Sequence, residues 1–425
     1  MNGAREALLR RIEAERDRLV AFLQAFTRID TCNPPGDTRA GAAFAGAALE
    51  AAGLTYRTIA PQETMPNLVA TTRFATPGRH LVLNGHLDVF PIGDRARWSR
   101  DPLSGAIVHG RVHGRGTVDM KCGTAASIIA YRHLAALRDA LAGRLSLTLV
   151  SDEETGGRWG SAYLVEHHAD DVLGDCVLNG EPSSPYTVRF GEKAIMWMRF
   201  VVRTPGGHSA YPHTSPSANK IAVRLARDLE SLEAILPTVP DAVARVMADP
   251  EARAAMERGL GAGASEIAQR VSVNLGVLRG GVKVNMLPSE CELEVDARLP
   301  VGVDASEVRA VVAEIVARYP NVAWEARPLS PPASWSDPGH EMVRHLQRNA
   351  EALLGVRPPA IVSLGATDCR FWRAAGVPAY VYGPSPEGMG APDESVSIDE
   401  FLHVVKTHAL AAFDYLDGHR PVDDR

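Results

Sequence analysis

The stretch RHLVLNGHLD, residues 79–88, contains the pattern that decides the expected fold. Its first half is a continuous apolar run typical of a strand buried on both faces, and its second half is a polar turn carrying His86 and Asp88. Apolar runs that end in charged residues recur in RLSLTLVSDEETGG (144–157) and DCVLNGEPSS (175–184). Helical patterns separate these strands, which predicts an α/β fold with a mostly parallel sheet and helices on both faces.

The pattern changes near residue 191, where a second domain is expected to begin. Strand, helix, two strands, helix and strand follow one another, which is the ferredoxin-like α+β order. The α/β pattern then resumes. We therefore predict a discontinuous α/β domain of residues 1–190 and 331–425 with an inserted domain at 191–330. A helical segment at about 239–269 is expected to extend the inserted domain.

Composition limits the classes of partner. The 425 residues carry a net charge of -6, and no basic run predicts binding to nucleic acid or to an acidic membrane surface. No apolar run approaches the length of a membrane span, and the N-terminus lacks the apolar core of a signal peptide. The five cysteines are scattered and form no C-x-x-C pair, which is typical of reduced thiols. These features predict a cytoplasmic protein.

Polar residues at strand ends are the candidate functional residues, because loops at the carboxyl ends of parallel strands lie together. His86 and Asp88 fit either a polar loop or a metal-binding imidazole whose second nitrogen is held by the aspartate. Asp119, in HGRGTVDMKCG (113–123), precedes a predicted helix. It fits either an N-cap of that helix or a carboxylate that bridges two cations.

Three glutamates follow the other two strands. Glu153 and Glu154 are adjacent, and two neighbouring carboxylates normally lie apart in solvent because they repel each other. Next to a metal ion, one can bind the ion while the other takes a proton from metal-bound water. Glu181 follows the third strand, and alone it indicates little.

Together these motifs carry a resemblance that extends over nearly the whole chain. The sequence resembles the metal-dependent amidohydrolases that include aminoacylase, acetylornithine deacetylase, succinyl-diaminopimelate desuccinylase and glutamate carboxypeptidase, which have a zinc-exopeptidase-like fold. The matched stretches are GHLDVFP (85–91), GRGTVDMKCG (114–123), DEETGG (152–157), GEPSS (180–184), GGHSAYPH (206–213), GGVKVNMLPSECELEVDAR (280–298) and GATDCRF (365–371). The resemblance implies that residues 1–190 and 331–425 form a metallohydrolase domain. It also implies that residues 191–330 form a lid that makes a homodimer.

The resemblance assigns a role to each matched residue of the metallohydrolase domain. It implies that two metal ions are held by His86, Glu181, Asp119 as the bridging ligand, and Glu154 on the second ion. It also implies that Glu153 is the general base and that Asp88 orients His86.

Three further residues match positions on the substrate side. His208 matches a lid histidine that enters the active site of the partner subunit and stabilises the developing oxyanion, and Asn285 matches a second lid residue that contacts substrate. Arg370 matches a residue that binds a substrate carboxylate, although a salt bridge with Asp368 is the other interpretation.

One expected ligand is missing. In the family the last metal ligand is a histidine in a C-terminal loop, and here its position falls at Gly390, in GPSPEGMGAPDE (383–394). His403 and His408 follow in a helical pattern, where we expect them to pack or to face solvent. We therefore predict one tightly bound divalent ion, zinc or manganese with cobalt possible, and a second ion that is weak or absent. We expect Gly390 to border the substrate.

The predicted function is metal-dependent hydrolysis of a C–N bond in a small carboxylate-bearing molecule. The resemblance implies deacylation of an N-acyl amino acid or a dipeptide by metal-activated water. Hydrolytic deamination of an activated aryl amine, such as a substituted aminobenzoate, is the first alternative, because a site with fewer metal ligands suits a more activated bond. A non-catalytic binding protein on the same fold is the second alternative.

Overall fold

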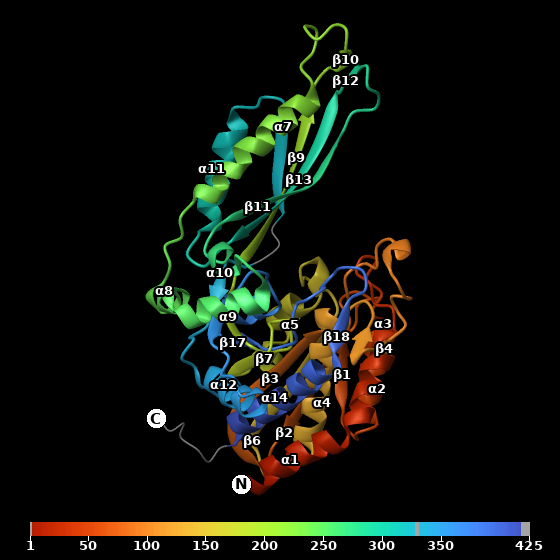
Figure 1. The fold of residues 1–425 in the computed structure, drawn as a ribbon, viewed down its shortest axis with the longest axis vertical. Helices are drawn as coiled ribbons and strands as arrows, with labels where there is room; N and C mark the ends of the chain where they lie inside the picture. The colour runs from red at the N-terminus through yellow and green to blue at the C-terminus, as the bar shows by residue number, and fades with distance from the viewer. Residues whose placement is uncertain (1, 328–330, 418–425) are drawn as a thin grey trace.

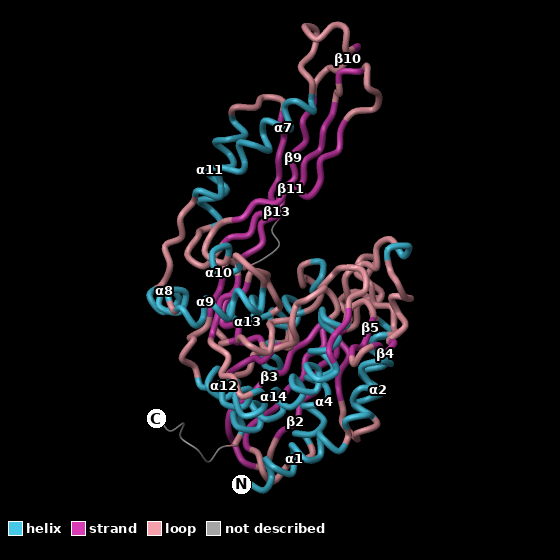
Figure 2. Tube along the Cα trace, in the orientation of Figure 1, coloured by secondary structure: helices cyan, strands magenta, loops and turns pink. Residues whose placement is uncertain are grey.

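The computed structural model describes residues 2–327 and 331–417. It consists of a larger α/β domain and a smaller domain that projects from it (Figure 1). The helices and strands of both domains can be followed along the chain in Figure 2. Among the described residues, no helix is both long enough and apolar enough to cross a membrane.

The larger domain is built on one sheet whose centre is parallel. Strand β3 lies between β6 and β7 and is parallel to both, and β17 continues the parallel part beside β7. The sheet order is β1 (Tyr56–Ile59), β2 (Asn67–Arg73), β6 (Ala142–Val150), β3 (Thr76–His86), β7 (Cys176–Asn179), β17 (Ala379–Val381), β8 (Val188–Glu192) and β15 (Ser334–Trp335), with β16 (Ala360–Ser363) also paired to β8. The outer pairs β1–β2, β2–β6 and β8–β15 are antiparallel.

Helices cover both faces of this sheet, as the sequence predicts. Leu81 and Leu83 of β3 belong to the main core on one face, whereas Val82 packs with Trp372 on the other. The helices of this domain are α1 (Asn2–Ala14), α2 (Arg16–Thr27), α3 (Arg39–Glu50), α4 (Cys122–Ala135), α5 (Ser161–His167), α6 (Ala169–Val172), α12 (Glu341–Leu354), α13 (Cys369–Ala374) and α14 (Ile398–Leu416). Three short turns are η1 (Arg95–Arg97), η2 (Thr117–Lys121) and η3 (Glu153–Thr155).

The strand ends bring the candidate residues together. His86 is the last residue of β3, Glu153 follows β6, and Glu181 follows β7. Because β6, β3 and β7 are neighbours and parallel, their carboxyl ends meet at one edge of the sheet. A small sheet of β4 (Ala106–Val108), β5 (Arg111–His113) and β18 (Ser395–Ser397) lies near this edge and leads into the segment carrying Asp119.

The inserted domain has the predicted ferredoxin-like arrangement. Its chain order is β9 (Ala194–Arg203), α7 (Ala218–Leu229), η4 (Glu230–Ala234), β11 (Ser272–Gly280), β13 (Glu290–Leu299), α11 (Ala305–Ala317) and β14 (Val322–Arg327). Its antiparallel sheet has the order β11-β13-β9-β14. Helices α7 and α11 cover one sheet face, and a two-stranded sheet of β10 (Gly207–His208) and β12 (Met286–Leu287) forms the outer tip (Figure 1).

The expectation that residues 239–269 extend the inserted domain is wrong. This segment forms α8 (Asp241–Ala248), α9 (Pro250–Leu260) and α10 (Ala264–Ile267). Helices α8 and α9 pack on β16, and their apolar side chains Val243, Met247 and Met256 join the core of the larger domain. The helical periodicity was sufficient to predict the helices, but it could not show which sheet would cover their apolar side.

Candidate active site

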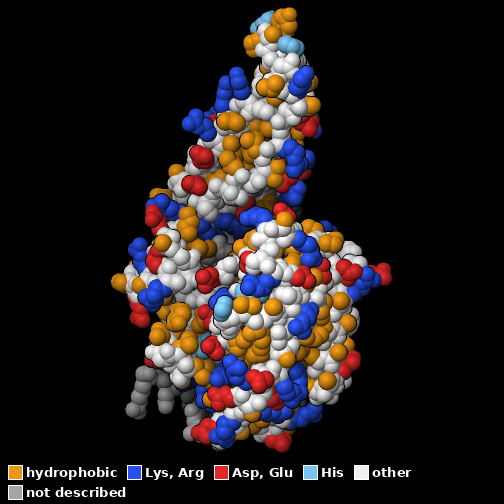
Figure 3. All heavy atoms as spheres, turned by 45° about the vertical axis from the view of Figure 1, so that its right-hand side comes forward, with side chains coloured by type: hydrophobic (Ala, Val, Ile, Leu, Met, Phe, Trp, Pro, Cys, Tyr) orange, Lys and Arg blue, Asp and Glu red, His pale blue; other side chains and the backbone are white. Residues whose placement is uncertain are grey.

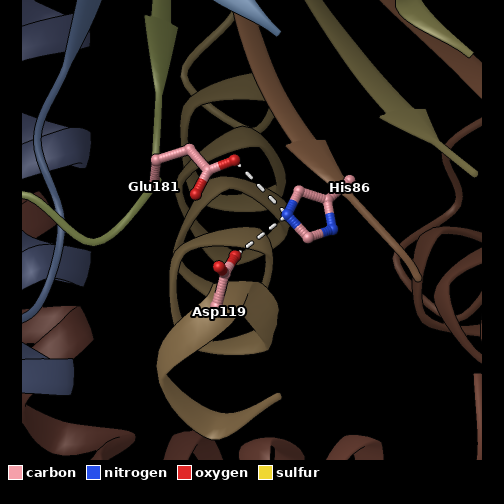
Figure 4. Close-up of side chains that lie close together, drawn as sticks. All are labelled: His86, Asp119 and Glu181. Carbon is pink, nitrogen blue, oxygen red and sulfur yellow. Dashed lines mark hydrogen bonds and ion pairs between the residues drawn. The ribbon is translucent and has the colours of Figure 1, made fainter. Parts of the chain in front are cut away.

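Three side chains converge at the carboxyl edge of the central sheet (Figure 4). His86 comes from the end of β3, Asp119 from the segment before α4, and Glu181 from the loop after β7. Nε2 of His86 lies 3.1 Å from Oδ1 of Asp119 and 3.3 Å from Oε1 of Glu181. One ligand atom from each residue lies within 4.8 Å of the other two, which is a spacing that a single metal ion can bridge.

The electrostatics of this cluster call for a positive charge. Burial, followed by the negative charge of Asp119, raises the pKa of Glu181 well above its usual value. Burial alone would lower the pKa of His86, but the charge of Glu181 and hydrogen bonds to Asp119 and Asp88 raise it well above the usual value. Two carboxylates facing one buried imidazole are stabilised by a cation. The residues therefore fit a divalent metal ion.

The alternative role for Asp119, capping the following helix, is wrong. The N-cap residue of α4 is Lys121, and no side chain makes a capping hydrogen bond there. The carboxylate of Asp119 points to His86 instead (Figure 4).

Asp88 contacts both His86 and the loop after β6. Nδ1 of His86 lies 2.8 Å from the backbone carbonyl oxygen of Asp88, whereas the Asp88 carboxylate is farther, at 3.5 Å. That carboxylate accepts hydrogen bonds from the backbone N–H groups of Glu153 at 3.3 Å and Glu154 at 3.1 Å. The carbonyl group therefore orients the imidazole more closely than the carboxylate does, and the carboxylate holds the two glutamates in place.

Asn33 helps to hold the Asp88 carboxylate in place, and this role was not predicted from the sequence. Its side-chain amide donates to Oδ2 of Asp88 at 2.9 Å and to Oγ1 of Thr155 at 3.0 Å. In the sequence Asn33 precedes two prolines and looks like a turn residue. No local pattern marks it, because its partners are distant in the chain and adjacent only in the fold.

Glu153 is held by Arg370 across the site. Nη1 of Arg370 donates to Oε1 of Glu153 at 2.8 Å, and Arg370 is only 1% exposed. The predicted alternative, a salt bridge between Arg370 and Asp368, is therefore wrong. Neither carboxylate oxygen of Asp368 has a hydrogen-bond partner among the described residues.

Glu154 lies outside the compact cluster. It is not among the three residues whose ligand atoms converge, and its Oε1 atom is buried without a hydrogen-bond partner among the described residues. Burial and the charge of Asp119 raise its pKa well above the usual value. A buried carboxylate oxygen without a partner is available to bind a cation, although Glu154 is not part of the three-donor cluster.

The loop containing Gly390 is held by a buried ion pair. Arg115 Nη1 contacts Glu394 Oε2 at 2.5 Å, and Arg115 Nη2 donates to the carbonyl oxygen of Gly390 at 2.9 Å. The other carboxylate oxygen of Glu394 accepts from the N–H of Val118 at 2.8 Å and, at 3.3 Å, from that of Asp119. Glu394 thus fixes both the loop of the missing ligand and the segment that carries a ligand.

A cavity of about 550 Å³ opens between the two domains over these residues. Asp119, Glu153, Glu154 and Arg370 line it from the larger domain, and Trp197 lines it from strand β9. Further lining residues include Phe90, Met389, Arg199, Arg298 and Arg327. Basic side chains are visible where the inserted domain meets the larger domain (Figure 3). The cavity therefore brings the acidic candidate catalytic residues together with a wall that carries three arginines and Trp197, along with Glu294 and Asp296.

The family model described as Peptidase family M20/M25/M40 matches residues 82–414. The chain belongs to this family. It is 28% identical over 362 residues to the succinyl-diaminopimelate desuccinylase of Cereibacter sphaeroides, covering 83% of this chain and 87% of that protein. As an M20-family protein with desuccinylase relatives, it is a metal-dependent hydrolase that acts on amide bonds. This finding disfavours the alternative of a non-catalytic binding protein.

Solved structures of the M20 family have the same fold. The M20-family metallo-carboxypeptidase of Sulfolobus solfataricus superposes with a TM-score of 0.81 at 17% identity, over 94% of this chain and 99% of its own. Human carnosine dipeptidase 1 superposes with a TM-score of 0.75 at 18% identity, over 97% of this chain and 99% of its own. Both include a counterpart of nearly every part of this chain, which supports the inserted domain as an M20-family feature.

His208 and Asn285 of this M20-family chain lie at the outer tip of the inserted domain, where histidine side chains are visible in Figure 3. Both are exposed, and neither lines the cavity. Nδ1 of His208 accepts a hydrogen bond from the N–H of Ala210 at 3.1 Å. Within one chain these two residues are not brought together with the metal cluster.

The two histidines after the Gly390 loop have structural roles. His403 and His408 lie on α14 and are buried. Nε2 of His403 is 2.6 Å from the hydroxyl of Tyr382, and Nε2 of His408 is 2.6 Å from the carbonyl oxygen of the same residue. The sequence left packing and exposure to solvent both open, and the two histidines pack; neither takes the place of the expected ligand.

Proposed function

We propose that this protein removes an acyl group from an N-acyl amino acid, or cleaves a dipeptide, in a substrate that carries a free carboxylate. The observation that carries this proposal is the three-donor cluster of His86, Asp119 and Glu181, with Glu153 and Arg370 on the wall of the same cavity. The desuccinylase relative, which by its name removes a succinyl group, acts on the same kind of bond.

His86, Asp119 and Glu181 would hold one divalent ion tightly, and Glu154 with Asp119 would hold a second ion weakly. Two carboxylates and one imidazole do not select strongly among zinc, manganese and cobalt. When bound, such an ion lowers the pKa of a coordinated water and polarises the carbonyl group of the substrate.

Glu153 is the proposed general base and acid. Its N–H is held by Asp88, so its carboxylate projects into the cavity from a fixed turn. It takes a proton from the attacking water and returns that proton to the leaving nitrogen, which completes hydrolysis of the amide. Asp88 and Asn33 are positioning residues, because they contact Glu153 or its turn but do not line the cavity.

The substrate carboxylate is proposed to bind to an arginine that lines the cavity. Arg370 presents a buried guanidinium to the cavity, and guanidinium groups bind carboxylates through paired N–H donors. On the inserted domain, Arg298 is already paired with Asp296 at 2.9 Å. Arg327 also lines the cavity and makes no ion pair with any described residue.

We also propose a cytoplasmic homodimer that forms through the inserted domain. All five cysteines are free, as expected for a reducing compartment. His208 and Asn285 are exposed at the tip, and a second chain could receive them in its cavity. His208 would then stabilise the developing oxyanion, and Asn285 would contact the substrate.

A second candidate, hydrolytic deamination of an aryl amine that bears a carboxylate, is favoured by the wall beside Gly390. Phe90 and Met389 line the cavity and are 50% and 47% exposed. A Cβ atom at Gly390 would approach only Phe90, at 3.9 Å. An aromatic ring could occupy this apolar space where a metal ligand is expected in the family. Water would then replace the amino group, releasing ammonia and leaving a hydroxyl group on the ring.

One product assay separates the two candidates. Purified protein loaded with manganese or zinc is incubated with N-succinyl and N-acetyl amino acids, dipeptides and substituted aminobenzoates. Release of a carboxylic acid and a free amino group supports deacylation. Ammonia without a carboxylic acid product contradicts it and supports deamination. The Glu153→Gln variant is the control for contaminating hydrolases.

A further inference from the structure

The surroundings of Arg370 contain more carboxylates than the arginine pairs with. Burial lowers the pKa of Arg370, but the negative charges of Glu153 and Asp368, and then that of Glu192, raise it overall. Glu192 is already occupied, because Oε2 accepts from the Thr367 hydroxyl at 2.8 Å and Oε1 lies 3.3 Å from Arg373 Nη1. Glu153 has the ion pair with Arg370, and Asp368 has none.

Asp368 is unusual because it is fully buried and unpartnered. Its exposed fraction is 0%, and both of its oxygen atoms lack a hydrogen bond among the described residues. It occupies the N-cap position of α13, yet its side chain caps no backbone N–H. A buried polar group without a hydrogen-bond partner destabilises the fold, and a charged group does so more strongly. A carboxylate in this position would therefore be stabilised by any movement that brings a hydrogen-bond donor to it.

Arg370 is the donor best placed to move. A guanidinium has five N–H donors in a fixed fork and can serve two carboxylates at once. Only Nη1 is used, and Nε is buried without a partner among the described residues. Arg370, Glu153 and the backbone at Gly365 line the cavity, so a bound molecule can reach the guanidinium directly.

We propose that Arg370 is exchanged between the general base and the substrate, with Asp368 as its second partner. In the free protein Arg370 pairs with Glu153. When a substrate carboxylate enters, it takes the guanidinium, Asp368 accepts the remaining N–H donors, and Glu153 is released to act as base. Asp368 is thus a positioning residue. The inference rests on the proposed function, because it assumes that Glu153 is the base and that the substrate has a carboxylate.

The exchange makes recognition of the carboxylate a condition for catalysis. If Arg370 only bound the substrate, removing the substrate carboxylate would raise KM and leave kcat unchanged. If carboxylate binding also releases Glu153, a substrate without it binds while the base stays paired, so kcat falls as well. Burial, and then the charge of Glu153, raises the pKa of Asp368 to about 7, so measurements at pH 8 keep this carboxyl mostly ionised.

The first experiment compares an N-acyl amino acid with its C-terminal carboxamide in the metal-loaded protein. We expect kcat for the carboxamide to be at least about tenfold lower, a loss of about 1.4 kcal/mol of transition-state stabilisation. Added acetate should restore part of that kcat by taking the place of the missing carboxylate. An unchanged kcat with a raised KM, and no response to acetate, would overturn the proposal. If neither compound is cleaved, the proposed function has failed, and the binding experiment still decides the exchange.

The second experiment measures succinate binding to the metal-loaded protein at pH 8 by calorimetry. Glu153→Gln should tighten binding about tenfold, because succinate no longer competes with Glu153 for Arg370. Asp368→Asn should weaken binding about threefold or more, because the moved guanidinium loses its second partner. A simple charge effect predicts tighter binding for both variants. Tighter binding to Asp368→Asn would therefore overturn the exchange.

Two further variants guard against structural effects. Glu294→Gln removes a different carboxylate from the cavity wall, and we expect it to change succinate affinity less than about twofold. If Asp368→Asn does not fold, Arg370→Lys replaces it, because a lysine ammonium cannot serve two carboxylates as a guanidinium fork does. Arg370→Lys should lower kcat for the N-acyl amino acid to that of its carboxamide. A full kcat in this variant would overturn the proposal.

Discussion

The two sides of the candidate metal site differ in how many ligands the chain supplies. On one side His86, Asp119 and Glu181 bring three ligand atoms within 4.8 Å of one another. On the other side Glu154 has a buried oxygen without a hydrogen-bond partner among the described residues, and Gly390 stands where the resemblance implies a histidine. The two sides share Asp119 and the support of Asp88, so they differ only in the remaining donors. We propose that the three-donor side holds one ion tightly and that the side of Glu154 holds a second ion only weakly.

The loop that contains Gly390 is nevertheless held in place by contacts other than a metal ion. Arg115 and Glu394 are both 1% exposed and pair with each other, and Arg115 also binds the carbonyl of Gly390. The loop conformation therefore does not depend on a metal ligand at Gly390. For this reason, changes at the two sides should have separable effects on metal content and activity.

The largest effect is expected from His86→Ala, which removes one of the three donors of the cluster formed with Asp119 and Glu181. Loss of the central imidazole leaves Asp119 and Glu181 facing each other without a nitrogen donor. Metal affinity and activity should fall by more than the roughly 10–100-fold that outer-shell partners cost. Elemental analysis and a hydrolysis assay measure the effect. His167→Ala, at an exposed helix position, is the control and should leave both unchanged. Retention of one full metal equivalent by His86→Ala would contradict the assigned ligand set.

Glu153→Gln tests whether catalysis can be lost while the cluster of His86, Asp119 and Glu181 still binds its metal ion. Glutamine keeps the shape but cannot accept the proton, so kcat should fall by roughly 10²–10⁴-fold. Metal content should stay at the wild-type value, because Glu153 is outside the three-donor cluster. Steady-state kinetics with parallel metal analysis checks both parts. A variant with wild-type kcat would exclude Glu153 as the general base.

Asp88→Asn tests the support shared by both sides. The variant keeps the carbonyl group that orients His86 but weakens the acceptor that holds the N–H groups of Glu153 and Glu154. We expect activity to fall about 10–100-fold, which is the usual cost of losing an outer-shell partner. Metal affinity should fall less than activity. A greater loss of metal than of activity would show that the carboxylate acts mainly on His86.

Gly390→His tests the side of the metal site that carries Glu154. A histidine there should raise the metal content from about one towards two equivalents per chain, because an imidazole would complement Glu154 and Asp119. Gly390 has a φ of 71°, so a non-glycine residue is expected to cost about 1–2 kcal/mol in stability. Gly390→Ala carries the same backbone cost without the imidazole and is the matched control. Two tightly held equivalents in the wild-type protein would contradict the one-metal prediction.

The smallest effect on the site is expected from His408→Gln. His408 is buried on α14, and burial lowers its pKa from 6.5 to about 4. The unfolded chain therefore binds the proton first, so the stabilising contribution is complete above about pH 6.5 and declines as the pH falls towards 4. The wild type should lose up to about 3 kcal/mol from this residue over that range.

The glutamine variant cannot take up that proton. It should be less stable at pH 7, since the 2.6 Å contact with Tyr382 is disturbed, but its stability should fall less steeply with acid. Urea unfolding at pH 7 and pH 5 measures both slopes. Metal content should not change. A loss of metal would contradict the structural role of this histidine.

The sequence predicted most of the strands, helices and domain order, but fewer of the contacts between side chains in the site. Apolar strands ending in His86, Glu153 and Glu181 predicted the parallel sheet and the edge where these residues gather, because strand periodicity and the strand-end rule are local signals. The order of elements after residue 191 predicted the ferredoxin-like domain for the same reason. The packing of α8 and α9 on the larger domain was missed, since the pattern of a helix shows its apolar side but not what covers that side.

By itself the sequence determined the family, the α/β framework with its inserted domain, and the residues available to bind a metal ion, and it led us to expect a glycine where the resemblance implies a ligand. Only the tertiary structure decided that Arg370 pairs with Glu153 rather than Asp368, that Asn33 supports Asp88, and that Arg115 and Glu394 hold the Gly390 loop. These partners are separated by 55 to 279 positions in the chain. The physical reason is that a charged side chain pairs with whichever opposite charge folding brings near it. Local periodicity contains no information about that choice.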